Sequence, residues 1–134
     1  MNAILIETSA ATCSAALVSN NKIIESFRSD NAMQHAVHLP LYVEEVMHIA
    51  NEKGIKIDVV AVSGGPGSYT GLRVGVSTAK GICFGRSLPL VSVDTLEILA
   101  TQGMGHDCAP FRIVPFIDAR RMEVYTAVFD AQAR

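Results

Sequence analysis

The sequence predicts an α/β fold, in which a βββαβαβα unit is followed by the start of a second copy of that unit. Three observations lead to this prediction. The chain opens with three short apolar segments separated by tight polar turns, it then alternates apolar segments with helical ones, and its opening pattern recurs after residue 111. Strands joined by tight turns pair antiparallel, whereas strands that are linked through helices pair in parallel.

The three antiparallel strands are expected at residues 3–7, 13–18 and 22–28. The first of them is a continuous apolar run, which is typical of a strand buried on both faces. Asn20 and Asn21 separate the second strand from the third, and asparagine tolerates positive φ, so this pair indicates a two-residue hairpin turn.

A helix is expected over residues 39–51, with Pro40 in its first turn, where the missing N–H costs nothing. Its apolar residues form one wide arc, and Glu44, Glu45 and His48 lie opposite. Leu41 falls among these polar residues, so it is either a scattered surface residue or a contact to a partner. Gly54 ends the helix.

Two further strands, at residues 57–62 and 89–93, are expected to run parallel to the first. A helix that ends near Phe84 follows the earlier strand, and a helix capped by Asp94 or Thr95 follows the later one. These elements complete a first domain that we expect to span residues 1–104.

The opening pattern returns in residues 105–134, after a linker that contains glycine and proline. An apolar segment ends in Asp118, a polar turn follows, and residues 123–129 alternate as a strand does. Glu7 and Asp118 therefore occupy equivalent positions in the two copies. The second copy stops after two strands and leaves a bare sheet edge, so we expect the chain to be a fragment of a longer protein.

The composition fits a folded domain that does not bind nucleic acid by itself. The 134 residues are 49% hydrophobic and 18% charged, which is enough apolar material for a core. The net charge is −2, whereas a protein that binds RNA alone usually has a basic excess.

Three cysteines without a C-x-x-C pair favour a reducing cytosol. No run of about 20 apolar residues occurs, so we expect a cytoplasmic protein without a membrane span.

The segment from Gly64 to Gly71 is the most specific candidate site. A strand, a glycine-rich turn and a helix start can direct backbone N–H groups toward an anion. The spacing matches neither a P-loop nor G-x-G-x-x-G, so phosphate binding and a purely structural turn, with several glycines at positive φ, both remain open. The candidate nucleotide or phosphate contacts are Glu7, Thr8, Gly65, Gly67, Ser68 and Asp118.

The helix that follows contains Gly71, Gly75, Gly81 and Gly85. Each interior glycine costs about 1 kcal/mol relative to alanine, so another backbone is expected to approach closely. That backbone belongs either to the chain's own sheet or to a partner's helix. In the second case this helix and the one at 39–51 form one interface, with contacts from Leu41, Glu45, Leu72, Gly75, Val76 and Ala79.

Two motifs resemble the signatures of the TsaB (YeaZ) family. Residues 65–75 read G-P-G-S-Y-T-G-L-R-V-G, and residues 117–125 read I-D-A-R-R-M-E-V-Y. The resemblance covers essentially the whole chain in order. Glu7 departs from the family pattern, because many members have aspartate at this position.

The resemblance implies the RNase H-like fold of the actin-like ATPase (ASKHA) superfamily. It also implies a non-catalytic paralogue of the catalytic subunit TsaD, which it binds and activates during threonylcarbamoyl transfer to the tRNA adenosine next to the anticodon. A TsaE-like ATPase would complete the complex, tRNA would be contacted indirectly, and a homodimer would form when TsaD is absent. ATP or ADP would bind in the assembled complex rather than to this chain alone.

The alternative is an enzyme that acts alone, either an ASKHA-type ATPase or kinase or a glycoprotease-like peptidase. A kinase needs a complete second half, and a peptidase needs a nucleophile with its base or a metal. Catalytic relatives bind metal through H-x-x-x-H, whereas His35 and His38 are only three residues apart. We therefore expect no catalytic residue and no metal site in this chain.

Overall fold

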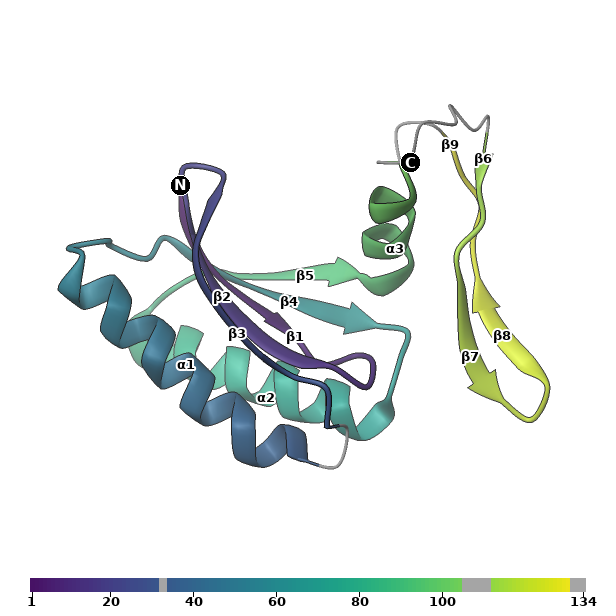
Figure 1. Cartoon of the computed structure of the whole chain (residues 1–134), viewed down its shortest axis with the longest axis horizontal. Coiled ribbons are helices and arrows are strands. Elements are labelled where there is room, and N and C mark those ends of the chain that lie inside the picture. The colour runs from purple at the N-terminus through teal and green to yellow at the C-terminus, as the bar shows by residue number, and fades with distance from the viewer. Residues whose placement is uncertain (32–33, 105–111, 131–134) are drawn as a thin grey trace.

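The computed structural model describes residues 1–31, 34–104 and 112–130. Its main body is a five-stranded sheet of order β3-β2-β1-β4-β5, with α1 and α2 together on one face and α3 beyond the end of β5 (Figure 1). The strands are β1 (Asn2–Glu7), β2 (Cys13–Ser19), β3 (Lys22–Ser29), β4 (Val59–Gly65) and β5 (Leu90–Asp94). The helices are α1 (His35–Glu52), α2 (Tyr69–Arg86) and α3 (Thr95–Gly103).

The pairing of the five strands confirms the predicted βββαβαβα unit. β1 pairs antiparallel with β2, and β2 pairs antiparallel with β3. β4 pairs in parallel with both β1 and β5. Asn20 and Asn21 form the turn between β2 and β3 with φ values of 50° and 61°, which is the conformation that a tight hairpin turn requires.

The start of α1 differs from the prediction. The helix begins at His35, so Pro40 lies inside it rather than in its first turn. Pro40 has no N–H to donate to the carbonyl of Ala36, four residues earlier, so one helical hydrogen bond is missing there. The end of the helix is as predicted: Gly54 follows it with φ 65° and donates its N–H to the carbonyl of Asn51.

The core lies between the sheet and the two long helices. Alternate side chains of β1, β2 and β4 point into it, as the two-residue period of a strand requires. On α1 they meet Leu39, Val43 and Val46, which are buried and lie one or two helical turns apart. The opposite face of the sheet is more open: Leu5 and Val91, for example, are exposed on it.

The last described part of the chain forms an arm that lies apart from the five-stranded sheet (Figure 1). Each predicted strand is divided in two, giving β6 (Arg112–Ile113), β7 (Phe116–Arg120), β8 (Glu123–Thr126) and β9 (Phe129–Asp130). Pro115 explains the first break, because it has no N–H for a strand ladder. β7 pairs with β8, and β6 pairs with β9. The predicted linker lies largely outside the described residues, so the domain boundary stays a prediction.

Candidate functional site

Glu7 ends β1, beside the carboxyl end of the parallel strand β4. Its Oε1 accepts a hydrogen bond from the backbone N–H of Ser9 at 2.5 Å and another from the hydroxyl of Ser63 at 2.9 Å. Both donors belong to the chain's own turn and sheet. One oxygen of this carboxylate therefore has a structural role, which is to hold the β1–β2 turn against β4.

Asp118 makes the same local contact in the arm. Its Oδ1 accepts from the N–H of Arg120 at 2.7 Å, two residues further on, as Glu7 does from Ser9. The two acids lie on separate sheets, Glu7 on β1 and Asp118 on β7, and their pairing stays a prediction. The described ranges contain no group of three or more His, Cys, Asp or Glu that is suited to hold a metal.

The glycine-rich loop and the start of α2 are tied to the β1–β2 turn. The N–H of Ser68 donates to the carbonyl of Ser9 at 2.7 Å, and the hydroxyl of Ser68 caps α2 by accepting from the N–H of Gly71 at 3.3 Å. These contacts fit the structural reading of the loop. The phosphate role of Glu7, Thr8, Gly65, Gly67, Ser68 and Asp118 stays a prediction.

The glycines of this loop are required mainly for space, which corrects the expectation of several positive φ values. Of those from Gly64 to Gly71, only Gly65 has a positive φ, at 105°. A Cβ on Gly67 would overlap the carbonyl oxygen of Ser9, and one on Gly71 would overlap that of Thr8. The β1–β2 turn therefore packs directly on the backbone at the start of α2.

Thr8 lies at the centre of this packing. It is fully buried, and its Oγ1 has no hydrogen-bond partner among the described residues. A Cβ on Gly75 would overlap that hydroxyl. Of the two readings of the glycine-bearing helix, close packing within the chain therefore holds for Gly71, which meets the Thr8 backbone, and for Gly75, which meets the Thr8 side chain.

A second candidate site is the outer face of α1 and α2. On α1 it carries Val37, Leu41, Glu44 and His48, and on α2 Arg73, Ser77, Lys80 and Phe84; all eight are exposed. The three large apolar residues among them are 62%, 54% and 92% exposed for Val37, Leu41 and Phe84. So much apolar surface on two neighbouring helices is typical of a protein contact.

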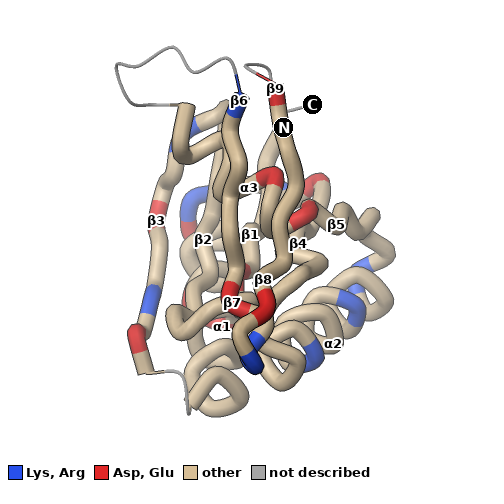
Figure 2. The backbone as a smooth tube through the Cα atoms, turned by 90° about the vertical axis from the view of Figure 1, so that its right-hand side faces the viewer, with Lys and Arg blue, Asp and Glu red and all other residues tan. Residues whose placement is uncertain are grey.

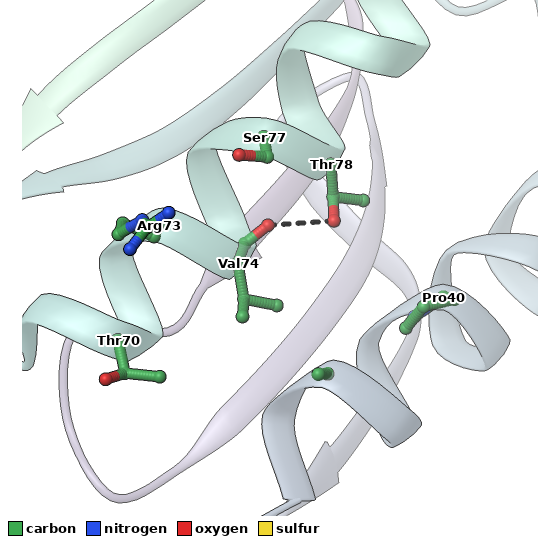
Figure 3. A pocket seen from close by; sticks show the side chains of 7 residues that line it. Pro40, Thr70, Arg73, Val74, Ser77 and Thr78 are labelled. Atoms are coloured by element: carbon green, nitrogen blue, oxygen red, sulfur yellow. Dashed lines mark hydrogen bonds between the residues drawn. The ribbon is translucent and has the colours of Figure 1, made fainter.

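A groove runs between the two helices along their length. At its N-terminal end it has a volume of about 390 Å³ and is lined by residues that include Pro40, Arg73 and Thr78 (Figure 3). It continues past Pro40 and Thr78 into a hollow of about 470 Å³ that reaches Arg86. The guanidinium of Arg73 also lies over the ring of Tyr69, 5.6 Å from its centre.

The charges on this face are divided between the helices. α1 has Glu44, Glu45 and Glu52 and no lysine or arginine, whereas α2 has Arg73, Lys80 and Arg86 and no acid. Basic segments follow α2 along its length in Figure 2. Within the described ranges, Glu52 pairs with His48 at 3.3 Å, and no ion pair joins α1 to α2.

The predicted interface residues fall into two groups. Leu41 and Glu45 are exposed on α1, and Leu72 and Val76 are half-buried on α2. Gly75 and Ala79 are buried inside the chain, so the expectation that they contact a partner is corrected. Their positions face the chain's own sheet, because the turn carrying Thr8 fills the space beside Gly75.

Sequence reasoning missed Val37, Arg73, Lys80 and Phe84 as parts of the outer face. A helical wheel contains the signal, since Phe84 falls opposite Gly75 and Ala79 at 100° per residue. Because of the glycines, the prediction placed the α2 part of the interface around Gly75 and Ala79, which are buried. Gly81 belongs to the outer face, because a Cβ there would meet nothing within 4 Å.

The two described cysteines are not part of either site. Burial raises the pKa of the thiols of Cys13 and Cys83, so they remain neutral and pack as small apolar groups. No helix in the described part of the chain combines the length and apolar character that crossing a bilayer demands.

Known proteins resemble this chain in both sequence and structure. Residues 25–133 match the family model described as TsaD: tRNA N6-adenosine threonylcarbamoyltransferase. The chain is 32% identical, over 96% of its length, to the tRNA threonylcarbamoyladenosine biosynthesis protein TsaB of Bacillus subtilis, and 31% identical over the same share to that of Escherichia coli. It covers 55% of each, so the chain spans about half the length of the curated relatives it matches.

Solved structures agree with these relatives. YeaZ from Pseudomonas aeruginosa superposes with a TM-score of 0.82 at 29% identity, over 96% of this chain and 60% of that chain. The fold is thus the predicted actin-like (ASKHA) one. The chain belongs to the family of the tRNA N6-adenosine threonylcarbamoyltransferase TsaD and, within it, to the TsaB (YeaZ) group.

Proposed function

We propose that this chain is a non-catalytic partner subunit, which binds and activates a TsaD-like catalytic subunit in threonylcarbamoyl transfer to the tRNA adenosine next to the anticodon. The proposal combines the names of the TsaB relatives with one observation. The outer face of α1 and α2 exposes Val37, Leu41 and Phe84 beside a continuous groove, which is the surface that a helical partner requires.

The contacts of Glu7 and of the glycine-rich loop support a structural role for these residues better than a chemical one. Glu7 holds the β1–β2 turn through Ser9 and Ser63. The glycine-rich loop has its Ser68 N–H bonded to Ser9 and its Gly67 backbone against the same carbonyl. The Ser68 N–H, which an anion site would use, is therefore engaged within the chain and ties the N-terminal end of α2 to the β1–β2 turn.

The other members of the assembly follow from the same proposal. A TsaE-like ATPase works with the complex, tRNA is reached through the catalytic subunit, and ATP or ADP binds in the assembled complex. The net charge of −2 agrees with an indirect tRNA contact. A second copy of the chain occupies the outer face when the catalytic subunit is absent. The whole assembly acts in the cytoplasm.

Reconstitution of tRNA modification tests this proposal. The TsaD-like and TsaE-like subunits of the same genome are incubated with tRNA, ATP and the threonylcarbamoyl donor, with or without this chain. We expect modified adenosine to accumulate only when the chain is added, and the chain alone to give none. Modification by the chain without the catalytic subunit would instead show that it is itself the transferase.

A further inference from the structure

We propose that the backbone carbonyl of Ala36 is a recognition point for the catalytic subunit, which places a side-chain N–H donor in the groove between α1 and α2. This inference rests on the proposed function, because it concerns the partner of the same outer face. It adds a specificity-determining residue, Pro40, which leaves that carbonyl without its donor inside the helix.

Pro40 opens the acceptor. In a regular α-helix the carbonyl of residue 36 accepts a hydrogen bond from the N–H of residue 40. α1 begins at His35, so Pro40 lies inside it, and proline has no N–H to donate. In the described residues, no backbone N–H from outside α1 donates to this oxygen. The acceptor is therefore left to solvent or to a partner.

The open carbonyl lies on the wall of the groove. Ala36 and Pro40 both line the N-terminal part of the groove, which has a volume of about 390 Å³, and both residues are exposed. A helical carbonyl points toward the residue four positions later, so the oxygen of Ala36 lies between the two lining residues. A side chain that enters the groove from outside passes beside it.

The opposite wall leaves this carbonyl free. Val74 and Thr78 lie on the side of α2 toward α1 (Figure 3). Val74 offers only methyl groups, and the Thr78 hydroxyl donates to the carbonyl of Val74 at 2.8 Å. The guanidinium of Arg73 lies over the ring of Tyr69. In the free chain, water is the donor that reaches the exposed Ala36 oxygen.

A partner that covers the groove must replace this water. A buried carbonyl without a donor costs free energy, because it loses its hydrogen bond to water and gains none. A partner whose amide or cationic side chain donates to Ala36 avoids that cost, whereas an apolar or acidic side chain at the same place does not. The exposed apolar residues Val37, Leu41 and Phe84 set no such polar condition, so the carbonyl adds selectivity to the face.

Calorimetric titration of the TsaD-like subunit of the same genome into the variant Pro40→Val tests the inference. Valine keeps apolar bulk in the groove and restores the N–H, which then donates to the carbonyl of Ala36. We expect the dissociation constant to rise at least about tenfold, because the partner's donor loses its acceptor. Pro40→Ala restores the same N–H without the bulk and should weaken binding by a similar factor.

Stability provides the second readout. Proline is the least favourable residue inside a helix, so the urea midpoint of unfolding should stay equal or rise in both variants. A residue that only supported the fold would lower stability and affinity together. Recognition of the carbonyl instead predicts weaker binding by a chain that is at least as stable as the unchanged one.

Pro89→Ala is the matched control. Pro89 is exposed and directly precedes β5 (Leu90–Asp94), outside α1 and α2. Its replacement removes one proline and leaves the groove unaltered, so the variant should bind the subunit as the unchanged chain does. Circular dichroism checks that every variant is folded.

Three results would overturn the inference. Pro40→Val could bind as tightly as the unchanged chain while Leu41→Glu binds more weakly, which would make the outer face the interface without recognition of the carbonyl. Loss of stability together with affinity in Pro40→Val would show a purely structural proline. Absence of binding by the unchanged chain would overturn the proposed function and this inference with it, so the two failures are distinguishable.

Discussion

The N-terminal half of α2 contains Gly71 and Gly75, and its C-terminal half contains Gly81 and Gly85, but their surroundings differ. A Cβ on either of the first two would overlap atoms of Thr8, whereas a Cβ on either of the last two would meet nothing within 4 Å. Gly71 and Gly75 lie on the buried face of the helix, which continues through Ala79 and Cys83, whereas Gly81 and Gly85 lie where the helix surface is open. Glycine is therefore required for space at two positions of this helix and not at the other two, and only the atoms around each position show the difference.

The largest effect is expected from Gly71→Ala. The added methyl group would overlap the Thr8 carbonyl oxygen, and because this is backbone, the turn must move to make room. We expect the free energy of unfolding to fall by about 3 kcal/mol, the upper part of the range for overpacking. Urea unfolding followed by circular dichroism measures this change. A variant as stable as the parent would show that the turn yields without cost.

A smaller loss is expected from Ser63→Ala. This change removes the hydroxyl that donates to Glu7 at 2.9 Å while Ser9 still donates to the same oxygen. The expected cost is about 1 kcal/mol, the usual net value of one hydrogen bond. If urea unfolding shows no loss, the hydroxyl contributes nothing and the turn is held by Ser9 alone.

Thr8→Val examines the same packing from the other side. The Thr8 hydroxyl is buried without a partner in the described residues, so replacing it with a methyl group of similar shape removes an unsatisfied polar group. We expect stability to stay equal or to rise by up to about 1 kcal/mol. A loss greater than that in urea unfolding would mean that the hydroxyl has a hydrogen-bond partner in solution.

The smallest effect is expected from Gly81→Ala. The position is helical and open, so alanine fits and raises helix propensity by up to about 1 kcal/mol. Thermal unfolding should show a slightly higher midpoint. Destabilisation would place Gly81 in the same class as Gly71 and remove the contrast between the two pairs of glycines in α2.

Much of the fold was predictable from local patterns. The antiparallel and parallel directions of the strands follow from turn lengths and helical crossovers, and the Asn20–Asn21 hairpin follows from the conformations that asparagine tolerates. Two features were not. The predicted start of α1 was wrong, because proline is favoured in the first turn of a helix and the prediction placed Pro40 there. The helix instead begins at His35, and the buried side chains of His35 and Leu39 pack on either turn before Pro40. The breaks within the arm strands also escaped prediction.

The site was less predictable, because it depends on which neighbour approaches each residue. The motif from Gly65 to Gly75 does not reveal that Ser9 and Thr8 fill the space beside its glycines. The outer face was partly recognised through Leu41, which fell outside the apolar arc of its helix and is exposed. Phe84 was missed although the helical wheel places it opposite Gly75 and Ala79, because the prediction did not establish that those two residues are the buried ones.

The most direct measurement of the central claim is binding of the TsaD-like subunit to this chain and to its variants Leu41→Glu and Phe84→Glu, followed by calorimetric titration. Ile23→Glu, at a position that is 69% exposed on β3, is the matched control. If the outer face of α1 and α2 is the interface, each of the two variants weakens binding at least about tenfold while remaining folded, and the control binds as the parent does. Unchanged affinity in both variants would contradict the account and place the interface elsewhere.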